Sequence, residues 1–464
     1  MKPPSFLYPA IALLAPLHAW ALPATIPVAV KVPPAPKFRI AAYLPEYRVL
    51  SLDPAVAANV TDLIFFSIEP TPDGGIDSRR LTPEIEARLM AIKKRYHVRL
   101  MVAFGGGDRS SSFPAMATDA GRRALFVKNM AQFLTRHGFD GVDFDWEFPN
   151  NPAEKDGLTA LVVETKRRLK PLGIQVSVAT APGDWFDPKL IAAADQFNVM
   201  SYFDESRHVG LAVSQTDVNH LLRNGAKPEQ ISLGIPFYAK NTITGVDDMS
   251  YGELEAKHHI APKEDTAGDH IFNGIQTVKD KTQYALDRGL GGVMIFELGQ
   301  DTGSGALSHA IHRMIDPTPD LLSAEADGTY LLTADNAVLE GPAAQIETSA
   351  GISDIGYWTS MDDRASWRIA VPPAKAGTYK VSLEYACDPL YAGSALTVTI
   401  DGKPTQTFVQ TVPGTKSWDD FRTMILPGTA TLVAGETKIH MQAKALPSGD
   451  LINLRKIVLT PVSK

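Results

Sequence analysis

Three carboxylates at alternate positions are the residues here whose types and spacing could do chemistry. The segment 139–149 reads FDGVDFDWEFP and places Asp143, Asp145 and Glu147 two residues apart. On a strand these side chains would share one face, and the apolar residues that alternate with them would share the other. Because the apolar side chains are large, we expect a buried strand with interior carboxylates rather than a solvated edge strand.

Crowded interior carboxylates cannot all ionise, so at least one of their pKa values should be raised. A glutamic acid that stays protonated near neutral pH can donate its proton to a glycosidic oxygen. Glu147 is nearest the C-terminal end of the predicted strand, where the active sites of parallel barrels lie. We therefore predict that Glu147 is a proton donor.

Eight short apolar runs are the predicted strands that must position the three carboxylates. They cover 39–43, 62–67, 99–104, 141–144, 175–179, 197–202, 231–236 and 292–296, and helical patterns such as 82–96, 121–137, 156–172 and 274–289 lie between several of them. This alternation predicts an α/β domain, a (β/α)8 TIM barrel over 38–317. A doubly wound open sheet is the alternative, but no glycine-rich phosphate loop follows the first run.

The two ends of the chain differ from the predicted barrel in composition and in sequence pattern. Residues 1–21 combine Lys2, an apolar stretch and a small-x-small cleavage site, so we predict a signal peptide and a secreted or periplasmic protein. Residues 22–37 hold five prolines and indicate an extended linker. From 320 to 464, short alternating segments separated by turn residues predict an all-β sandwich domain.

Composition narrows the possible partners. The net charge of −7 gives no electrostatic reason to expect nucleic acid, and no mature segment predicts membrane insertion. Cys387 is the only cysteine and the histidines lack ligand spacing, so we expect no intramolecular disulfide, no metal and no cofactor. We expect a monomer.

The segment from Asp140 to Glu147 resembles the Asp-Gly-x-Asp-x-Asp-x-Glu signature of glycoside hydrolase family 18, the chitinase-like family. Residues 103–106 resemble the family's Ser-x-Gly-Gly, with Ala103 in place of the serine. Residues 233–238 and 291–297 resemble its seventh and eighth strands, so the resemblance covers about 38–317.

This resemblance implies a mechanism without a protein nucleophile. The 2-acetamido oxygen of the substrate attacks C1 while Glu147 protonates the leaving group. Asp145 orients the acetamido nitrogen, and Asp143 shares a proton with Asp145. Tyr202 donates a hydrogen bond to the acetamido oxygen.

Two residues depart from the family pattern. Tyr202 is followed by Phe203 and then Asp204, so the usual acid is displaced by one position, and Phe296 stands where a tryptophan floor is typical. The candidate substrate-binding residues are Phe296, Trp185, Tyr238, Tyr43 and Asp204. The segment 239–291 looks too short for an extra α+β insertion, which by analogy implies an open, endo-acting site.

The expected substrate is an oligo- or polysaccharide that contains N-acetylglucosamine. We expect endo-acting, retaining hydrolysis of β-1,4 linkages in chitin or chito-oligosaccharides. Alternatives are an endo-β-N-acetylglucosaminidase that cuts the chitobiose core of N-glycans, and an inactive glycan-binding lectin. The C-terminal part more weakly resembles a carbohydrate-binding module, with four possible stacking residues, Tyr357, Trp358, Trp367 and Trp418; a structural cap with these aromatics in its core is equally compatible.

Overall fold

The computed structural model describes residues 37–202, 210–258, 260–261, 263–318, 320–349, 352–402 and 404–462. The predicted signal peptide, most of the predicted linker, and Asp204 lie outside these residues. Among the described helices, none is both long enough and apolar enough to cross a membrane.

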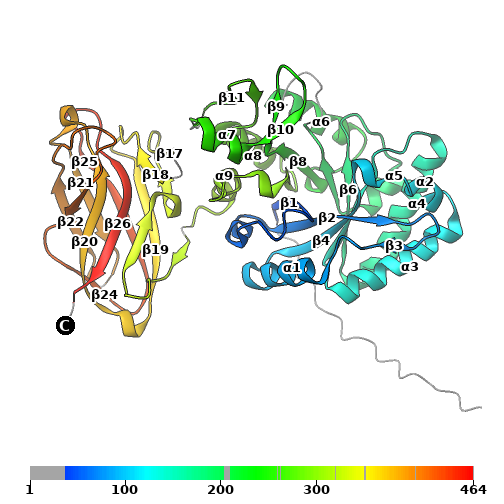
Figure 1. Cartoon of the computed structure of the whole chain (residues 1–464), viewed down its shortest axis with the longest axis horizontal. Coiled ribbons are helices and arrows are strands. Elements are labelled where there is room, and N and C mark those ends of the chain that lie inside the picture. Colours follow the sequence, from blue (N-terminus) through cyan, green and yellow to red (C-terminus); the bar gives the residue numbers. More distant parts are fainter. Residues whose placement is uncertain are drawn as a thin grey trace, which may run out of the picture.

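Eight parallel strands form a closed barrel, as predicted (Figure 1). They are β1 (Arg39–Pro45), β2 (Asp62–Pro70), β4 (Arg99–Gly105), β5 (Gly141–Asp145), β6 (Gln175–Thr180), β7 (Gln196–Val199), β8 (Ile231–Pro236) and β13 (Gly292–Phe296). The order is β1-β13-β8-β7-β6-β5-β4-β2, and β1 also pairs with β2, which closes the ring. The sixth barrel strand, β7, ends three residues before its predicted limit, so Tyr202 follows the strand.

Helices surround the barrel (Figure 1). They are α1 (Pro83–Tyr96), α2 (Phe113–Ala117), α3 (Ala120–His137), α4 (Pro152–Leu169), α5 (Pro188–Ala193), α6 (Leu211–Arg223), α8 (Ile275–Asp287) and α9 (Ala306–Ile315). Local chemistry sets their ends: Thr82 caps the first turn of α1, and His97 ends that helix in the left-handed conformation. Helix α1 buries Ile85, Leu89 and Ile92, which follow the helical period.

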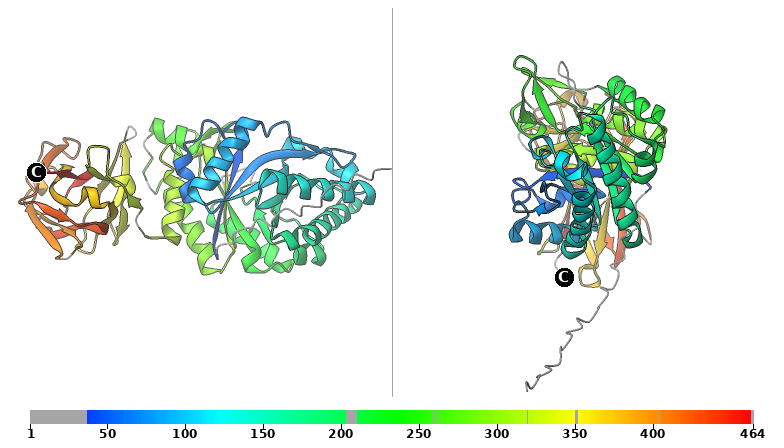
Figure 2. Two further views of the ribbon diagram at one scale, coloured as in Figure 1. Left: turned by 90° about the horizontal axis from the view of Figure 1, so that it is seen from below. Right: turned by 90° about the vertical axis from the view of Figure 1, so that its right-hand side faces the viewer.

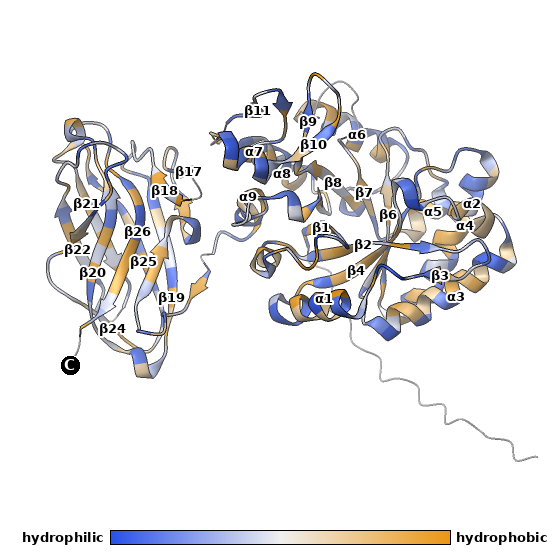
Figure 3. Ribbon diagram, viewed as in Figure 1, coloured by the Kyte–Doolittle hydropathy of each residue, from blue (hydrophilic) through white to orange (hydrophobic). Residues whose placement is uncertain are grey.

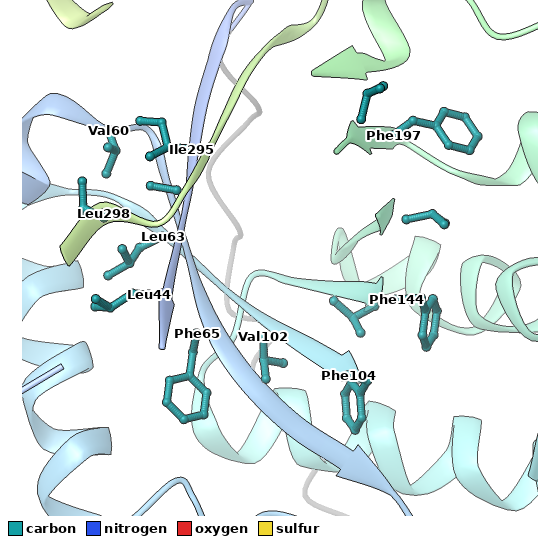
Figure 4. Packing of buried hydrophobic residues seen from close by; sticks show 14 of the residues in the cluster. Leu44, Val60, Leu63, Phe65, Val102, Phe104, Phe144, Phe197, Ile295 and Leu298 are labelled. Atoms are coloured by element: carbon teal, nitrogen blue, oxygen red, sulfur yellow. The ribbon is translucent and has the colours of Figure 1, made fainter. Parts of the chain in front are cut away.

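The barrel domain has two apolar clusters. The larger lies between strands and helices, and Figure 4 shows part of it, including Phe65, Phe104 and Phe144. The smaller fills the barrel interior and includes Tyr43, Ala103, Tyr202, Tyr238 and Met294. Each barrel strand therefore buries both faces, which explains the near-continuous apolar runs.

The segment between β8 and β13 corrects one expectation. It forms a four-stranded antiparallel sheet of order β10-β9-β12-β11 together with a helix. Its elements are β9 (Tyr238–Asn241), β10 (Asp247–Ser250), α7 (Tyr251–His258), β11 (Thr266–Ala267) and β12 (His270–Ile271). An α+β unit is thus present, and its very short strands explain how it fits into so few residues.

The C-terminal residues form two mainly antiparallel sheets (Figure 1). One holds β14 (Leu321–Leu322), β16 (Val338–Glu340), β19 (Arg364–Val371), β21 (Ala395–Ile400), β22 (Gln406–Thr411) and β25 (Gly435–Ala445). The other holds β15 (Tyr330–Thr333), β17 (Gln345–Ser349), β18 (Ile352–Gly356), β20 (Gly377–Ala386), β23 (Arg422–Ile425), β24 (Ala430–Leu432) and β26 (Asn453–Pro461). Hydrophobic and hydrophilic residues interleave along these strands (Figure 3), as expected for sheets with one buried face.

One apolar cluster joins the two sheets of the sandwich and shares no residue with the barrel clusters. Trp358 and Trp367 belong to it and are fully buried, with their indole N–H groups donating to the carbonyls of Ile355 and Thr333. These two tryptophans therefore build the core and have no surface for a sugar. The sandwich and the barrel form separate bodies in Figure 1 and in the left view of Figure 2.

Candidate active site

The three carboxylates lie at and beyond the C-terminal end of β5. Asp143 lies within the strand, Asp145 ends it, and Glu147 follows two residues later. The alternating apolar residues pack in the outer cluster, as predicted; among them Trp146 stacks on Phe113 with ring centroids 5.1 Å apart. The period of two therefore turns the aspartates toward the barrel interior.

Asp143 is fully buried and accepts three hydrogen bonds. The Tyr43 hydroxyl donates to Oδ2 over 2.7 Å, and Ser177 Oγ and Asn198 Nδ2 donate to Oδ1 over 2.5 and 3.0 Å. Burial raises the pKa of Asp143, while the three donors act against that rise. These bonds stabilise the carboxylate form. Sequence reasoning missed Ser177 and Asn198.

Asp145 has a different environment. It is 3% exposed, and its Oδ1 has no hydrogen-bond partner among the described residues. Burial, followed by the charges of Glu147 and Asp143, raises its pKa well above the ordinary aspartate value. Asp145 is therefore the aspartate that is set up to hold a proton.

Glu147 is positioned through its backbone. Its N–H donates to Ser110 Oγ over 3.0 Å, and Ser110 Oγ in turn donates to the carbonyls of Gly106 and Asp145. Partial burial and then the charge of Asp108 raise the pKa of Glu147. The loop after β4, which holds Asp108 and Ser110, thus supports the predicted acid; sequence reasoning did not identify either residue.

Aromatic side chains line the barrel mouth. Phe296 lies between Tyr202, Tyr43 and Phe66, with ring centroids 6.0, 5.8 and 5.7 Å away. Tyr238 meets Tyr202 edge to face at 6.0 Å. Burial, more than nearby charge, raises the pKa of Tyr202 well above its usual value, so its hydroxyl stays protonated and can donate.

The other predicted binding residues differ in how much of each side chain is exposed. Tyr43 is 2% exposed and bonded to Asp143, so it lies behind the carboxylates with almost no ring surface open to a sugar. Tyr238 is 8% exposed at the start of β9, whereas Trp185 is 58% exposed on the loop after β6. Trp185 also lines a cavity of about 270 Å³ together with Pro149, just past Glu147. Asp204 lies outside the described residues.

Charged residues border the aromatic group. Arg109 donates to both carboxylate oxygens of Glu46 and lies over the Phe66 ring. Glu297, directly after Phe296, pairs with Arg48, and burial raises its pKa to about 7. Within the described ranges, no three His, Cys, Asp or Glu side chains are grouped to hold a metal ion.

A parallel barrel with carboxylates of raised pKa at a strand's C-terminal end is typical of the glycoside hydrolases. The model of the family described as "Glycosyl hydrolases family 18" matches residues 39–301, and the chain belongs to this family.

Similar proteins that have been named are chitinases, which agrees with this family. "Probable chitinase 10" of Drosophila melanogaster is 24% identical over 324 residues, covering 52% of this chain and 14% of that protein. "Endochitinase 1" of Metarhizium robertsii is 25% identical over 267 residues, covering 45% of this chain and 63% of that protein. The chain thus spans less than two thirds of the length of these relatives.

Solved structures support the fold. A family 18 chitinase from the chitin utilization locus of Flavobacterium johnsoniae aligns with a TM-score of 0.54 and 22% identity, over 60% of this chain and 93% of that one. A chitinase from Cycas revoluta, in complex with (GlcNAc)3, aligns with a TM-score of 0.53 and 21% identity, over 60% of this chain and 99% of that one.

Proposed function

We propose that this chain hydrolyses β-1,4 linkages between N-acetylglucosamine residues in chitin or chito-oligosaccharides, acting within the sugar chain and with retention of configuration. The α+β unit between β8 and β13 removes the argument from segment length, so the endo action is proposed from the similarity to "Endochitinase 1". The observation that carries the proposal is the difference in environment among the three carboxyl groups at the end of β5. Asp143 accepts three hydrogen bonds, Asp145 lacks a partner at Oδ1 among the described residues, and Glu147 has a raised pKa. Family membership and the names of the relatives, which are chitinases, agree with this substrate class.

The proposed reaction has two steps. In the first, the carboxyl proton of Glu147 passes to the glycosidic oxygen, the bond from that oxygen to C1 breaks, and the acetamido oxygen bonds to C1. The resulting oxazolinium ion is positively charged, and the buried carboxyl groups stabilise it. In the second, water bonds to C1 while the bond from C1 to the acetamido oxygen breaks, which regenerates the neutral acetamido group. The water proton passes to the Glu147 carboxylate, so the acid is restored and the new reducing end has the β configuration.

Four side chains would hold the substrate in place for this reaction. The Oδ1 atom of Asp145 is available to accept the acetamido N–H, which would orient the oxygen toward C1. The protonated hydroxyl of Tyr202 would donate to the acetamido oxygen. Phe296 would lie beneath the reacting sugar, and Trp185, exposed beyond Glu147, would contact the leaving part of the chain.

Incubation of the purified protein with chitohexaose, and separately with a high-mannose glycoprotein, tests the substrate by mass spectrometry of the products. Shorter chito-oligosaccharides are expected from the first. Release of the glycan from the second, with chitohexaose intact, would replace this proposal with the N-glycan activity. Binding of either substrate without products would instead indicate a lectin.

Stereochemistry tests the mechanism separately. Proton NMR at early times should show the β anomer of the new reducing end, and a thiazoline analogue of N-acetylglucosamine should inhibit competitively. An initial α anomer would exclude participation of the acetamido group.

We also propose that the protein is exported and that residues 1–21 are removed. The charged start, apolar stretch and Ala19-Trp20-Ala21 site support this. N-terminal sequencing of the protein outside the producing cells should begin at Leu22, and an intact Met1 on the exported protein would contradict the proposal.

A further inference from the structure

We propose that the outer face of the sandwich carries a second glycan site, which binds a sugar chain with protonated amino groups, that is, a chito-oligosaccharide that has lost acetyl groups. Glu347 and Asp419 bind the ammonium groups, and Tyr357 and Trp418 contact the sugar rings. The inference goes beyond the proposed function by assigning a ligand to the C-terminal unit. It rests on that function only in the choice of a β-linked glucosamine chain.

A row of charged side chains crosses the outer face of one sandwich sheet. Glu347 on β17 is the direct partner of Asp354 on β18, so both carboxyl groups lie on the same face. The next residue, Ile355, packs in the sandwich core and pairs with Leu454 on β26. Because side chains alternate along a strand, Asp354 and Arg455 therefore lie together on the opposite, outer face.

The Asp354 carboxyl group is buried without full compensation. The residue is 8% exposed, and its Oδ1 has no hydrogen-bond partner among the described residues. Burial, and after it the charge of Glu347, raises the pKa of Asp354 to about 7, whereas Arg455 acts against that rise. The Arg455 guanidinium group also lies 3.3 Å from Glu384 and 3.6 Å from the centre of the Phe421 ring. An incompletely paired buried carboxylate destabilises a fold, which points to a ligand that supplies positive charge.

Further acids increase the negative charge of this face. Asp419 is exposed on the loop between β22 and β23, and Asp450 lies shortly before β26. Burial raises the pKa of Glu347, the Tyr357 hydroxyl acts against that rise, and the charges of Asp419 and Asp450 add to it. A neutral sugar would leave the repulsion between these acids in place, whereas an ammonium group would relieve it. Within the part of the chain that the structure describes, the acids do not form a group that could hold a metal ion.

Aromatic side chains border the acids. Tyr357 directly follows β18, is 49% exposed, and its hydroxyl interacts with Glu347. The carbonyl of Trp418 accepts a hydrogen bond from Asn453, and Asn453 and Glu347 both lie against Gly356. Aromatic rings pack on the apolar faces of sugar rings, and carboxylates bind ammonium groups strongly. A glucosamine chain offers both features at a regular spacing, which favours it over other cations.

Calorimetry with the full-length Glu147→Gln protein tests the site without cleavage. The ligands are the hexamers of glucosamine and of N-acetylglucosamine at about pH 6, where the amino groups of the first are protonated. Because the barrel also binds sugar, the readout is the change in affinity that each sandwich substitution causes. Glu347→Gln should weaken binding of the glucosamine hexamer about tenfold, and Asp419→Asn, which is exposed, about two- to fivefold. Binding of the N-acetylglucosamine hexamer should hardly change.

Further variants separate the sugar rings from the charge. Tyr357→Ala should weaken binding of the glucosamine hexamer about two- to tenfold, and Tyr357→Phe, which keeps the ring, should stay close to the parent protein. Glu340→Gln, exposed on β16 of the other sheet, is the matched control and should leave the affinity unchanged. Hexalysine carries the charge without sugar rings, so it should bind more weakly and should not respond to Tyr357→Ala.

Three results would overturn the inference. The first is an unchanged affinity for the glucosamine hexamer in both Glu347→Gln and Asp419→Asn. The second is an equal loss for both hexamers, because binding would then not depend on ammonium groups. The third is hexalysine that binds as tightly as the glucosamine hexamer, because the face would then recognise any cation. A wild type that cleaves no N-acetylglucosamine substrate would defeat the proposed function alone, since this binding is measured without cleavage.

Thermal unfolding of the free protein gives a readout that needs no ligand. The pKa of Asp354 is raised to about 7 in the folded state, above the ordinary value of 3.8, so the folded state is penalised increasingly as pH rises from about 4 to 7. Asp354→Asn should therefore raise the melting temperature at pH 7, and the gain should vanish toward pH 4. A lower melting temperature at pH 7 would show that the carboxylate is already compensated, and it would overturn the inference.

Discussion

Glu147 lies beyond the end of its own strand, because β5 ends at Asp145. The loop that follows β4 holds the backbone of Glu147 in place through Ser110. The Ser110 hydroxyl ties the Glu147 N–H to the carbonyl of Asp145. Because this tie uses backbone atoms, the carboxyl group can be changed without disturbing it.

Glu147→Gln should therefore lower turnover on any cleaved substrate by about two to four orders of magnitude, since proton transfer is lost. Binding of chito-oligosaccharide, measured by calorimetry, should be largely retained. Glu84→Gln, on the exposed face of α1, is the matched control. Wild-type-like turnover in Glu147→Gln would refute the assignment of the acid.

Asp108→Asn should shift the basic limb of kcat/KM. The negative charge of Asp108 raises the pKa of Glu147, so removing it lowers that pKa and ionises the acid at lower pH. Activity should consequently be lost at lower pH than in wild type, with the larger shift at low salt because Asp108 is exposed. Asp280→Asn, exposed on α8, should leave the profile unchanged, and an unmoved basic limb in Asp108→Asn would contradict this cause.

At the scale of single residues, the sequence predicted the carboxylates but not the side chains that donate hydrogen bonds to them. Asp143, Asp145 and Glu147 are visible because their spacing is local. Ser177 and Asn198 bind Asp143 across 34 and 55 residues, and neither is unusual within an apolar run. Trp358 and Trp367 show the reverse problem, because a tryptophan in an alternating strand is compatible with either face until the sheets are packed.

At the scale of elements, strands buried on both faces were the easiest to predict. All eight barrel strands were identified, because short, nearly continuous apolar runs that alternate with helical patterns are typical of a parallel sheet covered on both sides. The sheet of β9 to β12 was missed. Its strands have two to four residues and include polar ones such as Asp247 and His270, so no periodicity can develop.

Lys281 on α8 gives a prediction about an element. Its side chain is fully buried, its Nζ has no hydrogen-bond partner among the described residues, and burial lowers its pKa to about 7. The unfolded chain holds this proton up to the ordinary lysine pKa near 10.4, so the folded state is penalised most below pH 7 and the penalty fades as pH rises toward that value.

Lys281→Met should accordingly raise the melting temperature at pH 7, by roughly 2–4 °C for each kcal/mol regained. The gain over wild type should shrink as pH approaches 10, which calorimetry can follow. Lys257→Met, exposed on α7, should show no such trend. A destabilised Lys281→Met at pH 7 would mean that the ammonium group has a stabilising role.

At the scale of the whole molecule, two separate cores indicate two units that fold independently. A chain ending at Asp316 should therefore remain folded and keep most activity on soluble oligosaccharides, because every predicted catalytic residue precedes that point. Binding to insoluble chitin should weaken if half-exposed Tyr357 and the partly buried Trp418 contact sugar, since tethering raises the local concentration of cleavable sites.

Pull-down on chitin and thermal melts of the full and shortened chains check this prediction. A shortened chain that melts at much lower temperature and loses both activities would identify the sandwich as a structural cap. One that is equally stable and binds polymer equally well would contradict both a binding role and a capping role.

The closure of the barrel through β1 has a consequence for the time course of folding. Strand β1 pairs with β2 directly after it in the chain, and also with β13, about 250 residues later. During synthesis, the free edge of β1 must wait until Gly292–Phe296 has emerged, and an exposed strand edge is open to wrong partners. The β1 edge of the growing chain therefore needs to be shielded until the last barrel strand has been synthesised. During folding, the paired strands β1 and β13 should be the last part of the barrel to become protected from hydrogen exchange.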